Sequence, residues 1–260
     1  YDRFVNQGAV MGDSFGLENV LWFANNKEDA HEEPTIKRSR SHDYVSKEVI
    51  NVRENVGLIE VANFSKHEFK GPDARKFLDH IMAGRLPKPG RISLSPMLSY
   101  RGKLCGDLTV ACLDENEFMV FGSGAAQEMH RRWFESHLDK FNLSYSNRSD
   151  EYHGLSIAGP NSRKVLEKIV RDDVSNEKFK FRDSRRMFVG GVPAIINRIS
   201  FTGELGYEIY VAPHYQLKLY EELMEAGKEF NIKPFGGRAL MSMRLEKNWG
   251  AWTLDYRPDF

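Results

Sequence analysis

The feature that most constrains this chain is an internal repeat. The segment Gly71-Pro-Asp-Ala-Arg-Lys-Phe-Leu-Asp-His-Ile81 matches Gly159-Pro-Asn-Ser-Arg-Lys-Val-Leu-Glu-Lys-Ile169. In each copy a strand leads into Gly-Pro, and an Asx residue then caps a helix whose apolar residues recur at helical spacing. One strand-turn-helix unit used twice predicts a body with two similar halves.

A second pair of segments repeats in the same order. Tyr100 to Val110 aligns without a gap on Phe201 to Val211, and this alignment places Asp107 opposite Glu208. An amphipathic helix is predicted after each segment. The inward positions are Ala125, Met129, Trp133 and Leu138 in residues 125–138, and Leu219, Tyr220, Leu223 and Met224 in residues 215–226. The sequence therefore predicts an α+β fold with antiparallel sheets, packed helices and an internal pseudo-duplication, in which the two acids face each other or one ligand. The alternative is that two ordinary hairpins share glycines and β-formers by chance.

A β-hairpin is predicted around Asp107. Leu104 to Leu113 is rich in β-formers, residues 114–117 form a polar turn, and Phe118 to Gly122 is the return arm. Side chains alternate along a strand, so Asp107 shares one face with Cys105, Thr109 and Ala111, opposite Leu108, Val110 and Cys112. An acid in this position is solvated, paired with a cation, or used in chemistry.

Charge balance and cysteine content narrow the classes of partner and compartment. Thirty-seven Lys and Arg residues balance thirty-seven Asp and Glu residues, so no net field favours nucleic acid or an anionic membrane, and a small-molecule partner is expected. Cys105 and Cys112 lie on opposite faces of one predicted strand, roughly 23 Å apart at about 3.3 Å per residue, so they cannot pair and a reducing compartment is expected. No apolar run reaches the ~20 residues that span a bilayer. The start at Tyr1 indicates a piece of a longer chain.

Further elements complete the prediction. Residues 45–56 form a helix or turn, residues 57–62 a strand, and Val189-Gly-Gly-Val-Pro193 a tight turn between strands. Residues 236–247 form a helix that buries Leu240, Met243 and Leu245. Trp249 and Trp252 flank a glycine beyond this helix, and they either form a wall for a flat ligand or belong to the core.

Three motifs carry little weight. Gly12-Asp-Ser-Phe-Gly16 fits G-x-S-x-G, but eleven preceding residues cannot supply the strands of a hydrolase nucleophile elbow. Gly122-Ser-Gly124 lacks the third glycine of a dinucleotide loop and is interpreted as a strand-to-helix turn with Ser123 as its cap. The eight histidines show no metal-site spacing, so no metal is predicted.

Taken together, four segments resemble the tetrahydrofolate-binding aminomethyltransferase family, to which the glycine cleavage T-protein belongs. They are Val56-Gly-Leu-Ile-Glu-Val61, Gly90-Arg-Ile-Ser-Leu94, Ser200 to Val211 and Arg244-Leu-Glu-Lys247. The likeness runs from about Tyr1 to the last residue and is greatest to the folate half of the dimethylglycine and sarcosine dehydrogenases. It implies residues 1–43 as a lead-in and exposed loop and residues 44–260 as the tetrahydrofolate-binding domain, with the flanking flavin (FAD) domain and the C-terminal β-barrel absent from this sequence.

The resemblance also implies roles for individual residues. Asp107 matches the folate-site aspartate, a base or electrostatic anchor beside the folate amines, and Glu208 matches an acid that binds pterin. A carboxylate suits pterin because its two oxygens accept the neighbouring ring N–H and amino group. Departures from the family are Gly122 and Ser123 in place of an asparagine and a small residue, Phe201 and Leu94 in place of tyrosines, and Trp249 in place of a tyrosine or other aromatic residue. With Tyr207, these positions form the expected cofactor-binding set.

The function that the resemblance implies is tetrahydrofolate-dependent one-carbon transfer. The methyl-derived carbon of an N-methyl amine, such as dimethylglycine or sarcosine, is captured as 5,10-methylenetetrahydrofolate beside a flavin oxidoreductase domain in cis or in trans. Neither nucleic acid nor a membrane is expected as a partner, and the bacterial cytoplasm or the mitochondrial matrix is the expected compartment. The alternatives are a folate-dependent demethylase acting on another methyl donor and a folate-binding protein without catalysis. The Lys-Gly-Cys-Tyr segment of the iron–sulfur relatives is missing near Glu246-Lys-Asn-Trp-Gly250.

Overall fold

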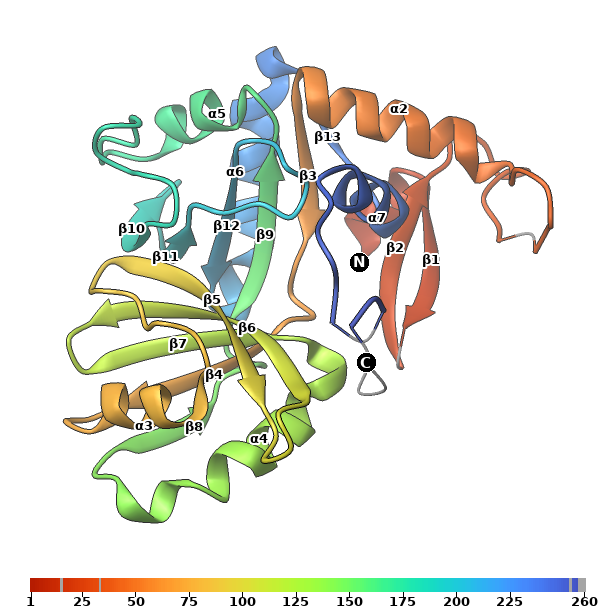
Figure 1. Cartoon of the computed structure of the whole chain (residues 1–260). Coiled ribbons are helices and arrows are strands. Elements are labelled where there is room, and N and C mark those ends of the chain that lie inside the picture. The colour runs from red at the N-terminus through yellow and green to blue at the C-terminus, as the bar shows by residue number, and fades with distance from the viewer. Residues whose placement is uncertain (15, 33, 253, 257–260) are drawn as a thin grey trace.

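A computed structural model describes residues 1–14, 16–32, 34–252 and 254–256. Two large sheets dominate the fold, with helices on their outer faces and a small hairpin at one side (Figure 1). The five-stranded sheet has the order β5-β6-β7-β4-β8, and its strands are β4 (Ser65–Lys70), β5 (Arg91–Leu98), β6 (Leu104–Asp114), β7 (Glu117–Gly122) and β8 (Ser144–Asn147). The six-stranded sheet has the order β10-β11-β12-β9-β3-β13, and its strands are β3 (Val56–Glu60), β9 (His153–Ala158), β10 (Ser184–Val189), β11 (Val192–Asn197), β12 (Gly206–Val211) and β13 (Ile232–Pro234). The α+β prediction is confirmed, as is the hairpin around Asp107.

The helices and the remaining strands complete the chain. They are α1 (Asp2–Asn6), β1 (Ala9–Ser14), β2 (Leu17–Phe23), α2 (Ser41–Glu54), α3 (Ala74–Ile81), α4 (Gln127–Glu135), α5 (Ser162–Ile169), α6 (Gln216–Gly227) and α7 (Gly237–Glu246), with 3-10 turns at Gly124–Ala126, Leu138–Lys140, Pro213–Tyr215 and Lys228–Phe230. All strand pairs are antiparallel except β13 with β3. Among the described residues, no helix combines the length and apolar character needed to cross a bilayer.

The two halves of the fold repeat one arrangement. The element order β4-α3-β5-β6-β7-α4 recurs as β9-α5-β10-β11-β12-α6, and the strand orders β5-β6-β7-β4 and β10-β11-β12-β9 correspond. Gly71 and Gly159 hold equivalent places with φ of +136° and +132°. A Cβ on Gly71 would lie 2.7 Å from Leu143 Cα, and one on Gly159 would lie 2.5 Å from Asn55 O, so both positions need glycine.

The second predicted repeat is wrong in detail. Ser65 pairs with Gly122 and His153 pairs with Val211. Ser65 lies six residues before Gly71, and His153 lies six residues before Gly159, so Ser65 and His153 are equivalent. Their strand partners are therefore equivalent as well, which makes Gly122 of β7 the equivalent of Val211 of β12. Asp107 lies on β6, the equivalent of β11, and therefore has no equivalence to Glu208. A glycine turn before a run of β-formers is common to many hairpins, and this local signal produced the match.

Three apolar layers hold the fold together. One lies between the six-stranded sheet and helices α5 and α6, and another between the five-stranded sheet and helices α3 and α4. The third, the central layer, lies between the two sheets and also receives residues of α2 and α7. Its fully buried members with 1% exposure or less are Val52, Ala111, Met119, Ala158, Tyr210, Ala239 and Met243.

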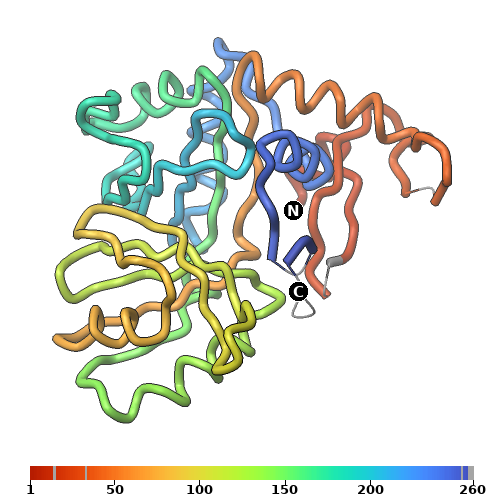
Figure 2. The backbone as a smooth tube through the Cα atoms, viewed as in Figure 1, coloured from red at the N-terminus to blue at the C-terminus, as the bar shows by residue number. Residues whose placement is uncertain are grey.

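The lead-in segment finds its partner in the structure. Strand β2 packs on α7 and α2, and the trace in Figure 2 shows this N-terminal strand running beside the late helix α7. Glu48 of α2 joins them, because its carboxylate accepts hydrogen bonds from Phe23 N (2.7 Å) and Gly236 N (2.9 Å). Trp22 is 1% exposed at this junction. The domain division at residue 43 stays a prediction.

Several predicted side-chain positions are wrong. On α4 the buried residues are His130 and Phe134, while Ala125 lies exposed before the helix and Met129 is 46% exposed. Leu245 of α7 is 62% exposed, because Arg244 takes the buried position beside Met243. The Asx residues do occupy the N-cap positions of α3 and α5, and Ser123 that of a 3-10 turn, but none of their side chains makes a cap hydrogen bond. The remaining helices and the Gly190-Gly191 turn agree with prediction.

Candidate functional site

Asp107 lies near the start of β6 on the face that leads to the central layer. It pairs with Pro96 of β5, and Thr109 and Ala111 follow on its own side of the strand. Ala111 belongs to the central layer, whereas Leu108 and Val110 on the opposite side pack under α3 and α4. The predicted division of the strand into two faces is confirmed from Asp107 onward. It is wrong for Cys105, which packs with Leu108 and Val110 because the pairing with β5 shifts register at this residue. Burial raises the pKa of the Asp107 carboxyl to about 6.

Glu208 occupies the middle of β12, between Asn197 of β11 and Ser156 of β9. It is 8% exposed, and its Oε2 accepts a hydrogen bond from the Tyr210 hydroxyl at 2.9 Å. Burial raises the pKa of Glu208 to about 7, and the Tyr210 hydrogen bond opposes the rise. A carboxyl in this state changes its charge near neutral pH.

The two acids project toward one layer from different sheets. Tyr210 shares the face of Glu208, and its ring stacks on Phe121 of β7 with centroids 4.5 Å apart. Phe121 pairs across the sheet with Thr109, which shares the face of Asp107. Asp107 and Glu208 do not occupy equivalent positions, but the contact between Phe121 and Tyr210 connects the strand faces that carry them.

Gly122 and Ser123 mark the turn from β7 to α4. A Cβ on Gly122 would lie 2.5 Å from Leu108 Cδ2, so a side chain such as the asparagine of the aminomethyltransferases requires Leu108 to shift within a packed layer. Ser123 is half-buried in extended backbone before the 3-10 turn. The glycine thus matches the packing of Leu108 beneath this turn.

Phe201 and Trp249 come together through Lys247. The Lys247 ammonium donates to Ser200 O at 2.9 Å, next to Phe201, and lies 4.9 Å from the centre of the Trp249 ring. Both aromatic residues are half-buried. Leu94 of β5 is 42% exposed and pairs with Thr109, so it lies on the same face of the sheet as Asp107. Of these three positions, Leu94 is the one that strand register places beside a candidate acid.

Tyr207 is not part of this surface. It neighbours Glu208 in the chain and therefore points to the other face of β12, where its ring is completely buried and stacks on Phe179 at 5.8 Å. Its hydroxyl oxygen is buried as well. The structure brings the ring into the layer under α5 and α6, away from Glu208.

Sequence reasoning missed three buried polar residues near the acids. Lys66 is completely buried, donates to Ala62 O at 2.6 Å, and lies 6.0 Å from the centre of the Tyr210 ring. Burial lowers its pKa to about 8. Asn197, the cross-strand partner of Glu208, is also completely buried. His130 of α4 stacks on Trp252 at 5.4 Å. The polar character of Lys66 and Asn197 at strand positions was the available signal.

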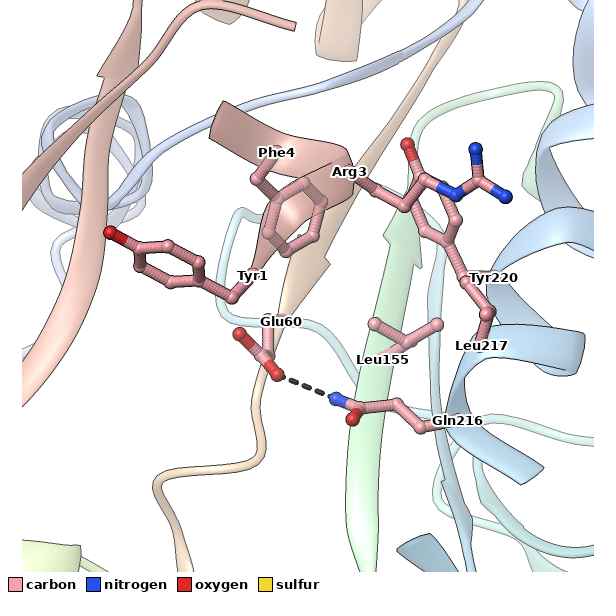
Figure 3. A pocket seen from close by; sticks show the side chains of 8 residues that line it. All are labelled: Tyr1, Arg3, Phe4, Glu60, Leu155, Gln216, Leu217 and Tyr220. Carbon is pink, nitrogen blue, oxygen red and sulfur yellow. Dashed lines mark hydrogen bonds between the residues drawn. The ribbon is translucent and has the colours of Figure 1, made fainter. Parts of the chain in front are cut away.

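Two cavities lie elsewhere, beside α1 and α6. One has a volume of about 90 Å³ and is lined by Tyr1, Phe4, Glu60 and Tyr220, with Gln216 donating to Glu60 at 2.6 Å (Figure 3). The other is bounded by Gln7 and by side chains of α6. The first is far smaller than the ~300–1,000 Å³ of typical ligand pockets. Neither includes a residue of the expected folate site.

Comparison with known proteins places the chain in a family. The family profile described as GCVT N-terminal domain matches residues 1–260. The chain belongs to this family. Mouse (Mus musculus) mitochondrial dimethylglycine dehydrogenase is 36% identical over 252 residues, which cover 96% of this chain and 29% of that protein. The sarcosine oxidase alpha subunit of Rhizobium meliloti is 32% identical over 255 residues, covering 95% of this chain and 25% of that subunit.

The fold agrees with that of a T-protein. The crystal structure of glycine cleavage system aminomethyltransferase T from Bartonella henselae superposes with a TM-score of 0.83 at 22% identity, covering all of this chain and 64% of that one. The predicted resemblance, fold class and aminomethyltransferase-type enzyme domain are therefore confirmed. The chain spans less than a third of the length of the dimethylglycine dehydrogenase and sarcosine oxidase relatives.

The two candidate acids fit the donor groups of tetrahydrofolate. Glu208 offers carboxylate oxygens for a pterin edge, and Asp107 offers a carboxyl whose pKa is raised to about 6. Among the described residues, no group of three His, Cys, Asp or Glu side chains is arranged to hold a metal ion.

Proposed function

We propose that this GCVT domain binds tetrahydrofolate and captures the methyl-derived carbon of an N-methyl amine, such as dimethylglycine or sarcosine, as 5,10-methylenetetrahydrofolate. The observation that carries the proposal is the pair of carboxyls, half-buried Asp107 and buried Glu208, on sheet faces joined by the Phe121 and Tyr210 contact. The names of the dimethylglycine dehydrogenase and sarcosine oxidase relatives support the class of amine. A flavin oxidoreductase domain, in cis or in trans, supplies the oxidised one-carbon unit.

The two acids have separate roles in this proposal. Tetrahydrofolate supplies the amine that takes up the carbon. Asp107, with its pKa raised to about 6, is mostly ionised at neutral pH and accepts the proton which that amine loses. Glu208 accepts the pterin N–H groups in its ionised form. Binding holds the amine and the one-carbon unit together, which converts a bimolecular encounter into an oriented step.

The proposed compartment is the bacterial cytoplasm or the mitochondrial matrix, supported by the mitochondrial relative and by the two free cysteines. Tetrahydrofolate titration by calorimetry, followed by product analysis with the N-methyl amine and the flavin partner, tests the proposal. Binding together with methylenetetrahydrofolate supports it. Methyltetrahydrofolate as product identifies a demethylase instead, and absence of binding contradicts any folate function.

A further inference from the structure

We infer that His130 is a positioning residue for Asp107: its imidazole holds the backbone bulge that precedes this acid on β6. The inference rests on the proposed role of Asp107 as the proton acceptor. His130 comes from α4, completely buried, and reaches β6 from the sheet face opposite to the Asp107 carboxyl. It therefore acts on the strand and has no direct contact with the acid.

The first observation is the bulge itself. Met97 of β5 pairs with Gly106, but Leu98 pairs with Leu104, so Cys105 is an extra residue on β6. A bulge turns the side chains that follow it, and Asp107 is the second residue beyond it. Cys105 O is 3.1 Å from His130 Nε2. Because a carbonyl oxygen only accepts, Nε2 carries the hydrogen in this contact. Burial lowers the pKa of His130, which keeps the ring neutral.

The second observation is the space made for the ring. A Cβ on Gly106 would lie 2.8 Å from His130 Nε2, and a Cβ on Gly122 would lie 3.2 Å from its Nδ1. Two glycines on neighbouring strands thus form a notch that admits the imidazole against the backbone. Trp252 stacks on the ring at 5.4 Å. In this notch the ring places Nε2 3.1 Å from the Cys105 carbonyl oxygen.

The third observation comes from the other half of the fold. The equivalents of Gly106, Gly122 and His130 are Val192, Val211 and Leu219, all buried and apolar. In that half the pairing of β10 with β11 ends at Val189 and Val192, so the Gly190-Gly191 turn stands where the first half has the bulge. A leucine therefore satisfies the packing at this place. The first half carries a histidine whose buried Nδ1 has no hydrogen-bond partner among the described residues, which is a cost that packing alone does not explain.

The test compares two side chains of similar shape in the full-length protein. His130→Gln keeps an amide donor near the place of Nε2, and His130→Met does not. His130→Leu copies the equivalent Leu219, and Met129→Leu on the exposed side of α4 is the control. Two readouts are independent of each other: the kinetics of methylenetetrahydrofolate formation, and the rate at which iodoacetamide alkylates Cys105, followed by peptide mass spectrometry.

We expect His130→Met and His130→Leu to lower kcat about tenfold or more, with KM for tetrahydrofolate within about threefold, because a displaced acid affects the chemical step more than binding. The acid limb of the pH profile of kcat moves to lower pH as Asp107 becomes more solvated, and Cys105 is alkylated about fivefold faster. His130→Gln and Met129→Leu stay near wild type in both readouts.

Several results overturn the inference. Unchanged Cys105 alkylation in the Met and Leu variants shows that the ring does not hold the bulge. If these variants keep the wild-type kcat while Asp107→Asn is inactive, the bulge does not position the acid. Failure of both apolar variants to fold makes the ring a core element. If Asp107→Asn itself keeps full turnover, the proposed function fails separately, and the alkylation rates still decide whether His130 holds the bulge.

Discussion

The rings of Phe121 and Tyr210 occupy equivalent positions in the two halves of the fold and stack on each other, with centroids 4.5 Å apart and planes at 28°. Contact between a residue and its own equivalent marks a two-fold axis, here a pseudo-symmetric one. The two halves depart from symmetry around this pair. Glu208 has Met119 as its equivalent, and Asp107 has Pro193. The candidate chemistry therefore lies where the two halves differ.

Tyr210→Phe keeps the stacked ring and removes the hydroxyl that donates to Glu208. This hydrogen bond lowers the pKa of Glu208, so its loss raises that pKa further above about 7. We expect tetrahydrofolate affinity to fall several-fold at pH 7 and to recover by about pH 9, where the carboxyl is ionised. Fluorescence titration across pH measures this. Tyr207→Phe, on the opposite face of the strand, is the control, and an equal loss in both variants contradicts the assignment.

Asp107→Asn removes the proposed proton acceptor with little change in shape. We expect methylenetetrahydrofolate formation to fall by ~10²–10⁴-fold, while tetrahydrofolate affinity changes by no more than a few-fold. Asp107→Ala behaves in the same way. Asp114→Asn, at the exposed end of the same strand, is the matched control. Turnover by the Asn variant at the wild-type rate rules out a catalytic role for Asp107.

Glu208→Gln tests whether the Glu208 carboxyl makes the free energy of unfolding depend on pH. Burial raises the pKa of Glu208 from its ordinary 4.5 to about 7, so the folded state binds the proton more tightly than the unfolded state. The stability from this group is complete below pH 4.5 and is lost as pH rises through about 7, by up to ~3 kcal/mol. We expect the Gln variant to lack this loss in urea melts at pH 5 and pH 8, and to bind folate more weakly. Identical pH slopes for the two proteins contradict the burial of an ionisable group.

Gly122→Asn introduces the side chain that the aminomethyltransferases carry at this position. Because the new Cβ lies 2.5 Å from Leu108 Cδ2, we expect a destabilisation of ~1–3 kcal/mol in denaturant unfolding. Ser123→Asn, one residue later and half-buried, is expected to change stability by no more than ~0.5 kcal/mol. If the two variants are equally stable, Leu108 moves aside at little cost and the expectation is wrong.

Glu48→Ala leaves two buried amides, Phe23 N and Gly236 N, without their acceptor. We expect a loss of ~2–5 kcal/mol in unfolding free energy, because each orphaned donor bears its desolvation penalty. Glu54→Ala, exposed on the same helix, is expected to have a small effect. A small effect at both positions would show that water replaces the carboxylate at the junction of β2 and α7.

Local patterns predicted much of the fold and of the site. The strand-turn-helix units around Gly71 and Gly159, the hairpin of β6 and β7, and the two faces of Asp107's strand depend on alternation, helical spacing and glycine conformation, all of which are legible over a few residues. The family resemblance also came from short segments. Such segments can be recognised from their own residues, without knowledge of how the rest of the chain folds.

Only the tertiary structure decided which elements correspond and which side chains meet. The sequence match set Asp107 against Glu208, but strand order and register make β12 the equivalent of β7. The inward face of α4 depends on the notch that two distant glycines provide for His130, and the glycine at position 122 depends on Leu108. The sequence by itself determined the class of fold and the family, and it proposed the two acids. The contacts between residues far apart in the chain, which no local pattern encodes, determined their pKa values, their surroundings and the true symmetry of the molecule.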